Sequence, residues 1–191
     1  MFILISGPSG SGKTTIINEV IKFFDGKMAL LPSSTTRPMR PGETEGQYYF
    51  YLTKEQFEKA IKEGEFIEYQ KVFANGNYYG VSKIRFDEFS KKYPLLIKDV
   101  DVLGVTEIAN KKDIDSVSIY LDVEKNELIS RLKKRGDSPE EIKIRVERKE
   151  FEDSFKPKYN YVINNKKLQN SIAKVIKIVQ KELKSRKVLI N

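Results

Sequence analysis

The chain has 191 residues and a formal net charge of +8, and 39% of its residues are hydrophobic. It contains no cysteine and no histidine, which excludes disulfides, thiolate metal sites and serine–histidine catalysis. No apolar run approaches the roughly 18–20 residues that a membrane helix needs, so we expect one compact cytoplasmic domain without membrane contact. The lysines are scattered along the chain, and we interpret them as solvated surface charge rather than as a nucleic-acid-binding face.

Apolar runs and turn signals divide the chain into alternating strands and helices. The opening run MFILI is short and lacks a basic segment before it, so it is interpreted as a strand rather than as a signal peptide. Strands are predicted at 2–6, 28–34, 48–52, 93–101, 116–123 and within 159–165. Helices are predicted at 13–24, 54–63, 83–92, 124–135, 139–153 and 168–187. Thr53 with Gln56 forms a capping box, and Ser138 with Pro139 and Glu141 marks a second helix start.

Strands separated by helices predict an α/β fold with a parallel sheet and right-handed crossovers. The stretch 35–82 interrupts this alternation, because it is rich in turns and in β-type residues. Within it, FIEYQKV and NYYGVS flank Asn75-Gly76, a typical hairpin turn. We therefore expect 35–82 to form a small insert that stands off the main sheet.

The first strand leads into the stretch GPSGSGKTT, which begins at Gly7. Gly7, Gly12, Lys13 and Thr14 fit the pattern G-x-x-x-x-G-K-[ST] between an apolar strand and a periodic helix. In such a loop the backbone amides point at phosphate oxygens, and the helix start adds its positive dipole end. The lysine would reach the β- and γ-phosphates of a nucleoside triphosphate, and the Thr14 hydroxyl would ligate Mg²⁺. This predicts a P-loop NTPase core that binds ATP with Mg²⁺, although the loop alone does not identify the phosphate acceptor.

The arginines, unlike the lysines, are few, and six of the eight occur in pairs: Arg37 with Arg40, Arg131 with Arg135, and Arg145 with Arg148. Guanidinium groups can bind a phosphate dianion with two hydrogen bonds, and tyrosine pairs near the first arginine pair could donate to the same phosphate. A solvated basic loop beside core tyrosines is the alternative interpretation of that segment.

At this point the sequence resembles a known family. The segments SGPSGSGKTT, SSTTRPMRPGE, GEFIEY, GNYYG, DVDVLG, RLKKRGDSPEE and YNYVINN occur in the order and spacing of guanylate kinases, over residues 3 to about 170. The resemblance implies one guanylate kinase-like domain over 1–191 and transfer of the ATP γ-phosphoryl group to GMP, giving ADP and GDP. It also implies a core (1–34, 83–130 and 155–191), a β-rich region for the nucleoside monophosphate (35–82) and a helical lid (131–154).

The resemblance also implies roles for individual residues. ATP would be bound by Gly7, Pro8, Ser9, Gly10, Ser11, Gly12, Lys13, Thr14, Thr15, Arg131, Asn164 and Asn165. GMP would be bound by Ser33, Arg37, Arg40, Tyr49, Glu68, Tyr79, Asp99 and Asp101. The residues expected to act in catalysis are Lys13, Arg40, Asp99, Arg135 and Arg145. Thr14 would ligate Mg²⁺, and Asp99 is a candidate second contact through a water molecule.

Elementary chemistry agrees with these roles. The Glu68 carboxylate can accept hydrogen bonds from both N1–H and the 2-amino group of guanine, a pair of donors that adenine lacks. Asp99 and Asp101 end an apolar strand, where parallel sheets present their ligand-binding side chains. Arg131 and Arg135 share a helix face, and closure of a lid would bring Arg135 and Arg145 onto the transferring phosphoryl group.

The chain departs from the family pattern at several positions. Val81 stands where a threonine or serine hydroxyl usually helps to read guanine, Leu103 replaces a glutamine, and Asn165 replaces an aspartate. These departures leave open a related kinase with a shifted nucleoside- or sugar-phosphate acceptor. A non-catalytic guanylate kinase-like binding module is a further alternative, although such modules typically lose the P-loop lysine or the phosphate arginines. The sequence does not decide between a monomer and a homodimer.

Overall fold

The main sheet of the protein is parallel throughout, as predicted. The structure, a computed structural model, describes residues 1–72 and 76–187. Within this part of the chain the five strands follow the order β2-β7-β1-β8-β9. They are β1 (Phe2–Ser6), β2 (Met28–Leu30), β7 (Leu95–Asp99), β8 (Ser116–Asp122) and β9 (Tyr161–Asn164). The central strand β1 pairs in parallel with both β7 and β8. The loop after β1 therefore opens at the carboxyl edge of the sheet, next to the ends of its two neighbours.

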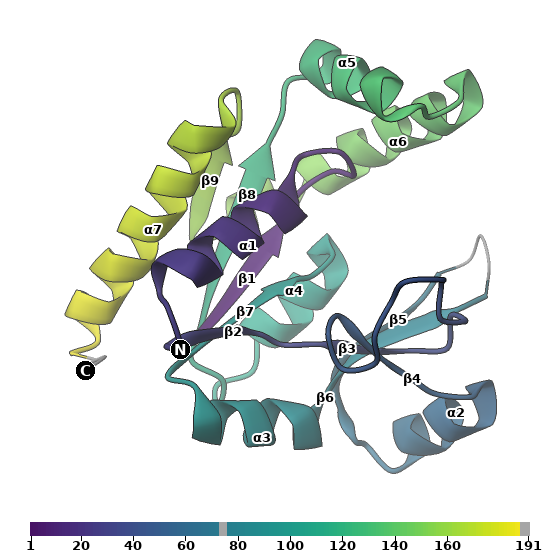
Figure 1. Ribbon diagram of the computed structural model, residues 1–191, viewed down its shortest axis with the longest axis vertical. Coiled ribbons are helices and arrows are strands. Elements are labelled where there is room, and N and C mark those ends of the chain that lie inside the picture. Colours follow the sequence, from purple (N-terminus) through teal and green to yellow (C-terminus); the bar gives the residue numbers. More distant parts are fainter. Residues whose placement is uncertain (73–75, 188–191) are drawn as a thin grey trace.

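Helices cover both faces of this sheet (Figure 1). Ile3 and Ile5 of β1 pack in one hydrophobic cluster with α1 and α7, whereas Phe2 and Leu4 pack in a second cluster with α3 and α4. This division follows from the alternation of side chains along a strand. The four helices are α1 (Lys13–Phe23), α3 (Lys83–Lys92), α4 (Val102–Ala109) and α7 (Leu168–Ser185). The result is a three-layer α/β core.

The interval 28–34 does not form one strand, and that prediction was wrong. The chain leaves the main sheet at β2 and enters a second sheet at β3 (Ser33–Thr35). Pro32 lies at this transition and has no N–H to continue a ladder. The backbone N–H of Leu31 donates to Ile97, whereas that of Ser33 donates to Tyr48 of the second sheet. The change of sheet places Ser33 between the two.

The second sheet has the order β4-β3-β6-β5 and stands beside the core (Figure 1). Its other elements are β4 (Tyr49–Tyr51), α2 (Lys54–Lys62), β5 (Phe66–Lys71) and β6 (Tyr78–Ser82). The predicted capping box of Thr53 and Gln56 is present at the start of α2. β5 and β6 are antiparallel neighbours, while Asn75 of the predicted turn lies outside the described residues. The division into core, insert and lid remains a prediction.

Two helices project from the core near the loop after β1 (Figure 1). They are α5 (Lys125–Arg135) and α6 (Pro139–Asp153), and a short 3-10 helix, η1 (Lys156–Lys158), follows them. The capping box of Ser138 and Glu141 starts α6, as predicted. The sequence analysis missed α4 and extended the preceding strand to residue 101, whereas Asp101 caps α4 by accepting from the Gly104 N–H at 2.7 Å. In the described part of the chain, no helix is both long and apolar enough to cross a membrane.

Candidate active site

The loop between β1 and α1 requires glycine at two positions where the backbone has positive φ and passes close to other atoms. Gly7 has φ 140°, and a Cβ atom there would lie 2.5 Å from the backbone oxygen of Leu121. Gly10 has φ 87°, and its Cβ would lie 2.8 Å from the side chain of Leu132. Lys13 Nζ bends over the loop and donates to the carbonyls of Gly7 at 2.6 Å and Pro8 at 3.2 Å. Loop and lysine thus form a compact, positively charged cradle at the start of α1.

The side chain of Asn165 is hydrogen-bonded to the phosphate loop. This side chain is fully buried, and its Nδ2 donates to the Ser11 carbonyl. The Asn165 backbone N–H donates to the carbonyl of Asp122 at 2.7 Å, which fixes the segment to the end of β8. The side chain of Asn165 therefore contacts the loop. A cavity of about 270 Å³ lies beside this segment and is lined by Asn164, Asn165 and residues of the β8–α5 connection. Arg131 also borders the segment, since it donates to the Asn165 carbonyl at 2.9 Å.

Three charged side chains from the α5–α6 region gather over the loop. Asp137 forms ion pairs with Arg135 at 2.5 Å and with Arg145 at 2.8 Å. Arg145 also donates to the Ser9 hydroxyl at 2.7 Å, and Arg135 lies 3.5 Å from the same oxygen. The hydrogen bond from Arg135, and then the charge of Arg145, hold the pKa of the Asp137 carboxyl below its usual range. One carboxylate therefore orients both predicted lid arginines toward the loop.

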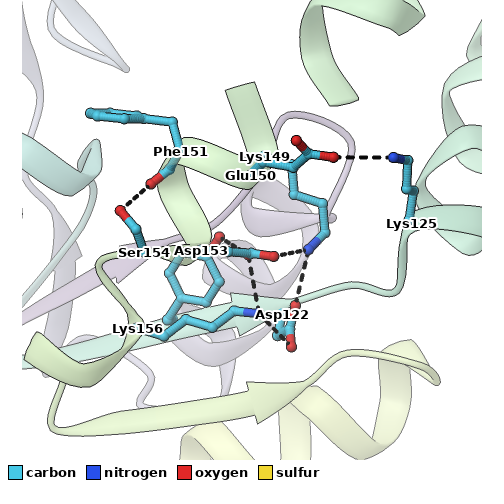
Figure 2. Close-up of polar contacts among 9 residues, drawn as sticks. Asp122, Lys125, Lys149, Glu150, Phe151, Asp153, Ser154 and Lys156 are labelled. Carbon is cyan, nitrogen blue, oxygen red and sulfur yellow. Dashed lines mark hydrogen bonds and ion pairs between the residues drawn. The ribbon is translucent and has the colours of Figure 1, made fainter. Parts of the chain in front are cut away.

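A second ionic network fixes α6 to the core (Figure 2). Lys149 is buried on α6 and contacts both Asp153 and Asp122, the latter at 3.5 Å. Lys156 pairs with Asp122 at 2.9 Å and with Asp153 at 3.1 Å. The Tyr120 hydroxyl donates to Asp153 at 2.9 Å. Asp122 belongs to β8, so the network ties the base of α6 to the sheet. None of these residues was singled out from the sequence.

The predicted acceptor residues other than Arg37 and Arg40 line a cleft of about 880 Å³. Its lining residues come from the phosphate loop, the carboxyl edge of the main sheet, the second sheet, the start of α4 and α6. The cleft brings together the predicted residues Ser9, Ser33, Tyr49, Glu68, Tyr79, Asp99, Asp101 and Arg145. These residues come from both sheets and from α6, so the fold joins segments that are far apart in sequence.

The first arginine pair lies at the edge of this region. The Arg37 guanidinium binds Glu43 through two hydrogen bonds of 2.8 and 2.9 Å and lies 5.1 Å from the centre of the Tyr49 ring. These bonds hold the pKa of Glu43 well below its usual range. Tyr49 packs edge-on against Tyr79, with 6.0 Å between ring centres. Arg40 is exposed, and its backbone N–H donates to Glu43 at 2.7 Å. Glu43 thus orders the loop that carries both arginines.

Three charged side chains, Glu68, Lys98 and Asp99, line the cleft. Glu68 is only 6% exposed, and burial raises the pKa of its carboxyl, while the charge of Lys98 opposes this shift. Lys98 is 4% exposed, and burial lowers its pKa against the charges of Glu68 and Asp99. Asp99 opens onto the cleft, where the surrounding protein raises the pKa of the carboxyl and Lys13 lowers it. The sequence analysis missed Lys98, although a lysine inside the apolar run LLIKDVD was an available signal.

The two departures that border this region differ in exposure. Val81 is fully buried and pairs in register with Glu68 across β5 and β6, so it adds no polar atom to the cleft. Leu103 is 39% exposed and lines the cleft. Asp101 both caps α4 and lies 3.9 Å from Arg148. Its carboxylate therefore has a structural task besides any contact with a ligand.

Residues near the N-terminus of α1 provide oxygen ligands suited to a magnesium ion that binds together with a nucleotide. Thr14 and Asp99 line the same smaller cavity, together with Ser33 and Lys98. Mg²⁺ typically takes one or two protein oxygen ligands and completes its shell with phosphates and water. A hydroxyl and a carboxylate facing one cavity provide that donor set.

The fold and this site define a class of protein. A parallel α/β sheet, a glycine-rich loop leading into a helix and a lysine over that loop are those of a P-loop NTPase. The family model described as guanylate kinase matches residues 1–182, and the chain belongs to the guanylate kinase family. It is an enzyme of that family.

Individual relatives agree with this assignment. The guanylate kinase of Clostridium tetani is 35% identical over 183 residues, which cover 95% of this chain and 86% of the relative. The guanylate kinase of Streptococcus agalactiae is 38% identical over 186 residues, with 95% and 87% covered. Among solved structures, the guanylate kinase of Anaplasma phagocytophilum has a TM-score of 0.73 and 25% identity, and the match covers 95% of this chain and 85% of that chain.

Proposed function

We propose that the chain transfers the γ-phosphoryl group of ATP to GMP and forms ADP and GDP. The observation that carries this proposal is the single cleft in which Ser9 of the phosphate loop and Glu68 of the second sheet both lie. A donor and an acceptor bound at these two places would meet over Asp99 and Arg145, which line the same cleft.

On the donor side, the backbone amides of residues 7–12 and Lys13 bind the triphosphate, and the helix dipole of α1 adds to the attraction. Thr14 would hold Mg²⁺, with Asp99 as a candidate second contact through water, and a bound Mg²⁺ would supply positive charge that offsets the charge of the phosphates. The base of ATP would lie near Asn164 and Asn165, which line the 270 Å³ cavity, and Arg131 borders this segment through its hydrogen bond to the Asn165 carbonyl.

On the acceptor side, Arg37, Arg40, Tyr49 and Tyr79 bind the phosphate of GMP. Glu68 accepts hydrogen bonds from N1–H and the 2-amino group of guanine, and Ser33 donates to its 6-oxo group. Asp99 and Asp101 orient the acceptor. The attacking group is already a phosphate oxyanion, so positioning and charge neutralisation carry the reaction and no strong general base is needed.

Arg135 and Arg145 stabilise the charge of the transferring phosphoryl group. Both are already oriented toward Ser9 of the loop by Asp137. Lid closure in the presence of both nucleotides should protect the amides of 131–150 from hydrogen exchange. Equal exchange with and without nucleotides would contradict this part of the proposal.

The decisive experiment measures ADP release from Mg·ATP with GMP, dGMP, AMP, CMP and UMP in parallel. Lys13→Ala provides the inactive reference, and Lys22→Ala, an exposed lysine on the same helix, is the matched control. We expect turnover with guanine acceptors far above the others. Comparable turnover with several acceptors would support a kinase with a shifted acceptor, and no turnover with any of them would support a binding module.

A further inference from the structure

Lys98 is a buried charge in the cleft for which the proposed reaction has no use. It lies on β7 and is 4% exposed. Its ammonium group donates to the Leu31 carbonyl at 3.1 Å and to the Ser33 hydroxyl oxygen at 2.5 Å. Both acceptors belong to the segment where the chain passes from the main sheet to the second sheet. Lys98, Ser33 and Glu68 all line the main cleft.

The contact with Lys98 decides which way the Ser33 hydroxyl can act. An ammonium group has three donors and no acceptor, so the Ser33 oxygen must accept in this pair. The hydroxyl proton of Ser33 therefore points away from Lys98. The neighbouring Leu31 carbonyl is already bonded to Lys98, and Ser33 borders the cleft. Acceptance of a charged hydrogen bond also polarises the O–H and strengthens it as a donor.

The rest of the base-reading surface makes this donor necessary. Glu68, when ionised, offers only acceptors, and Val81 beside it in the sheet has no polar side-chain atom. A surface of one donor and one carboxylate is complementary to a 6-oxopurine, which presents an oxygen at position 6 and an N–H at position 1. A 6-aminopurine presents the opposite pattern at both positions.

Resting on the proposed function, we propose that Lys98 is a positioning residue that fixes Ser33 as a hydrogen-bond donor to the 6-oxo group of the acceptor base. It thereby supplies through Ser33 the hydroxyl donor that Val81 cannot provide. Lys98 itself acts through Ser33 and does not take part in the phosphoryl transfer.

The test combines a change in the enzyme with a change of one atom in the substrate. The variants are Lys98→Met, Ser33→Ala, their combination, and Lys91→Met as a control at an exposed lysine on α3. The acceptors are GMP, 6-thio-GMP and IMP. 6-Thio-GMP keeps the N1–H and the 2-amino group but replaces the 6-oxygen by sulfur, a weak acceptor. IMP keeps the 6-oxygen and lacks only the 2-amino group.

For Lys98→Met we expect the KM for GMP to rise about tenfold, the upper range for loss of one hydrogen bond. The kcat and the KM for ATP should stay within about twofold of the wild type. The preference for GMP over 6-thio-GMP should fall to the level of Ser33→Ala, and the double variant should lose nothing more. The charge of Lys98 also lowers the pKa of Glu68, so the assays are run at alkaline pH to keep Glu68 ionised in every variant. Under these conditions the preference for GMP over IMP should not change. Lys98→Gln, which keeps a side-chain donor, should retain part of the preference.

An unchanged preference for GMP over 6-thio-GMP in Lys98→Met would overturn the inference, as would an equal loss with all three acceptors. If Lys98→Met does not fold, Lys98→Gln takes its place, and a preference for GMP over 6-thio-GMP equal to that of the wild type would overturn the inference. Unchanged discrimination in Ser33→Ala would overturn it as well, because it removes the donor from the argument. These outcomes differ from failure of the proposed function, in which the wild-type protein itself would not phosphorylate GMP.

Discussion

On the donor side of the cleft, the groups proposed to face phosphate are mainly backbone amides held by the loop of residues 7–12, whereas on the acceptor side the groups proposed to read the base are the side chains of Ser33 and Glu68, carried by strands of the second sheet. The loop conformation depends on glycines with positive φ and on close packing against the end of β8. The acceptor side depends on buried charges, Glu68 and Lys98, which approach from β5 and β7. A backbone site is specified by a few adjacent residues, but a site of buried charges exists only once the whole fold has formed.

The strongest test of the backbone site is Gly7→Ala. The new Cβ would lie 2.5 Å from the Leu121 oxygen, so the loop must shift away from its phosphate-binding shape. We expect kcat/KM for ATP to fall more than about a hundredfold, because several phosphate contacts move together. Steady-state kinetics with varied ATP measures this loss.

Gly26→Ala is the matched control, since Gly26 also has positive φ but nothing lies within 4 Å of a Cβ there. It should cost about 1 kcal/mol of stability through backbone strain alone and leave the kinetics unchanged. Equal kinetic losses in both variants would assign the loss to general destabilisation instead of the close approach of Gly7 to β8.

The corresponding test of the acceptor side is Glu68→Gln. The amide keeps the shape of the carboxylate but loses the charge and one of the two acceptors. We expect kcat/KM for GMP to fall about a hundredfold, since hydrogen bonds to charged groups contribute about 1.5–3 kcal/mol each. The loss should be smaller for IMP, which has one donor fewer. Competition assays with GMP and IMP measure both changes.

Glu63→Gln, at the exposed end of α2, is the control and should behave as the wild type. If Glu68→Gln lost GMP and IMP activity to the same degree, Glu68 would not be reading the 2-amino group. The comparison between backbone and side-chain recognition would then hold only for the donor side.

The same contrast explains what the sequence could predict. Gly7, Gly12 and Lys13 lie within seven residues of one another, and their spacing alone indicated a phosphate-binding loop. The contact between Lys98 and Ser33 joins residues 65 positions apart, and no local pattern reports such a pair. The parallel order of the main sheet followed from the alternation of strands and helices.

Two errors of secondary structure have a similar origin. The run 28–34 is continuously suited to a strand, and only the pairing partners of Leu31 and Ser33 divide it between two sheets. α4 is eight residues long and begins directly after the predicted strand 93–101, and its apolar run VLGV is too short to show a helical period. Both segments border the cleft, where tertiary contacts outweigh local propensity.

The network beneath α6 offers a test that concerns stability more than chemistry. Lys149→Met leaves Asp122 and Asp153 with only Lys156 as a cationic partner among the described contacts. Removal of one partner typically costs about 3–5 kcal/mol when the charge left behind is buried, but the side chains of Asp122 and Asp153 are each 29% exposed. Because Lys156 remains, we expect a loss of about 2 kcal/mol in the free energy of unfolding by urea.

The pH dependence of this loss provides its control. Burial raises the pKa of Asp153, but hydrogen bonds from Lys149, Lys156 and Tyr120 outweigh burial and lower it. A lowered pKa stabilises the fold above the unfolded value of about 3.9 and ceases to do so as the pH falls through the folded value. The difference between wild type and Lys149→Met should therefore shrink below about pH 4. A difference that stays constant down to pH 3 would assign the loss to packing instead of charge.

The smallest effect is expected from Asp137→Asn, which separates orientation of the lid arginines from their charge. Asp137 pairs with both Arg135 and Arg145, and its neighbours hold its pKa low enough to keep it ionised at neutral pH. The variant keeps both arginines but weakens the bonds that aim them at the loop. We expect kcat to fall about tenfold, the order of one charged hydrogen bond, with the KM values for ATP and GMP within twofold of wild type.

The control is Asp113→Asn, at an exposed position before β8, which should change neither kcat nor the KM values. An unaltered kcat in Asp137→Asn would mean that substrates alone orient the arginines, and a raised KM for ATP would mean that Asp137 shapes the loop in the ground state. A fall in kcat alone would show that Arg135 and Arg145, like the backbone amides of the loop, are held in position before the phosphoryl group moves.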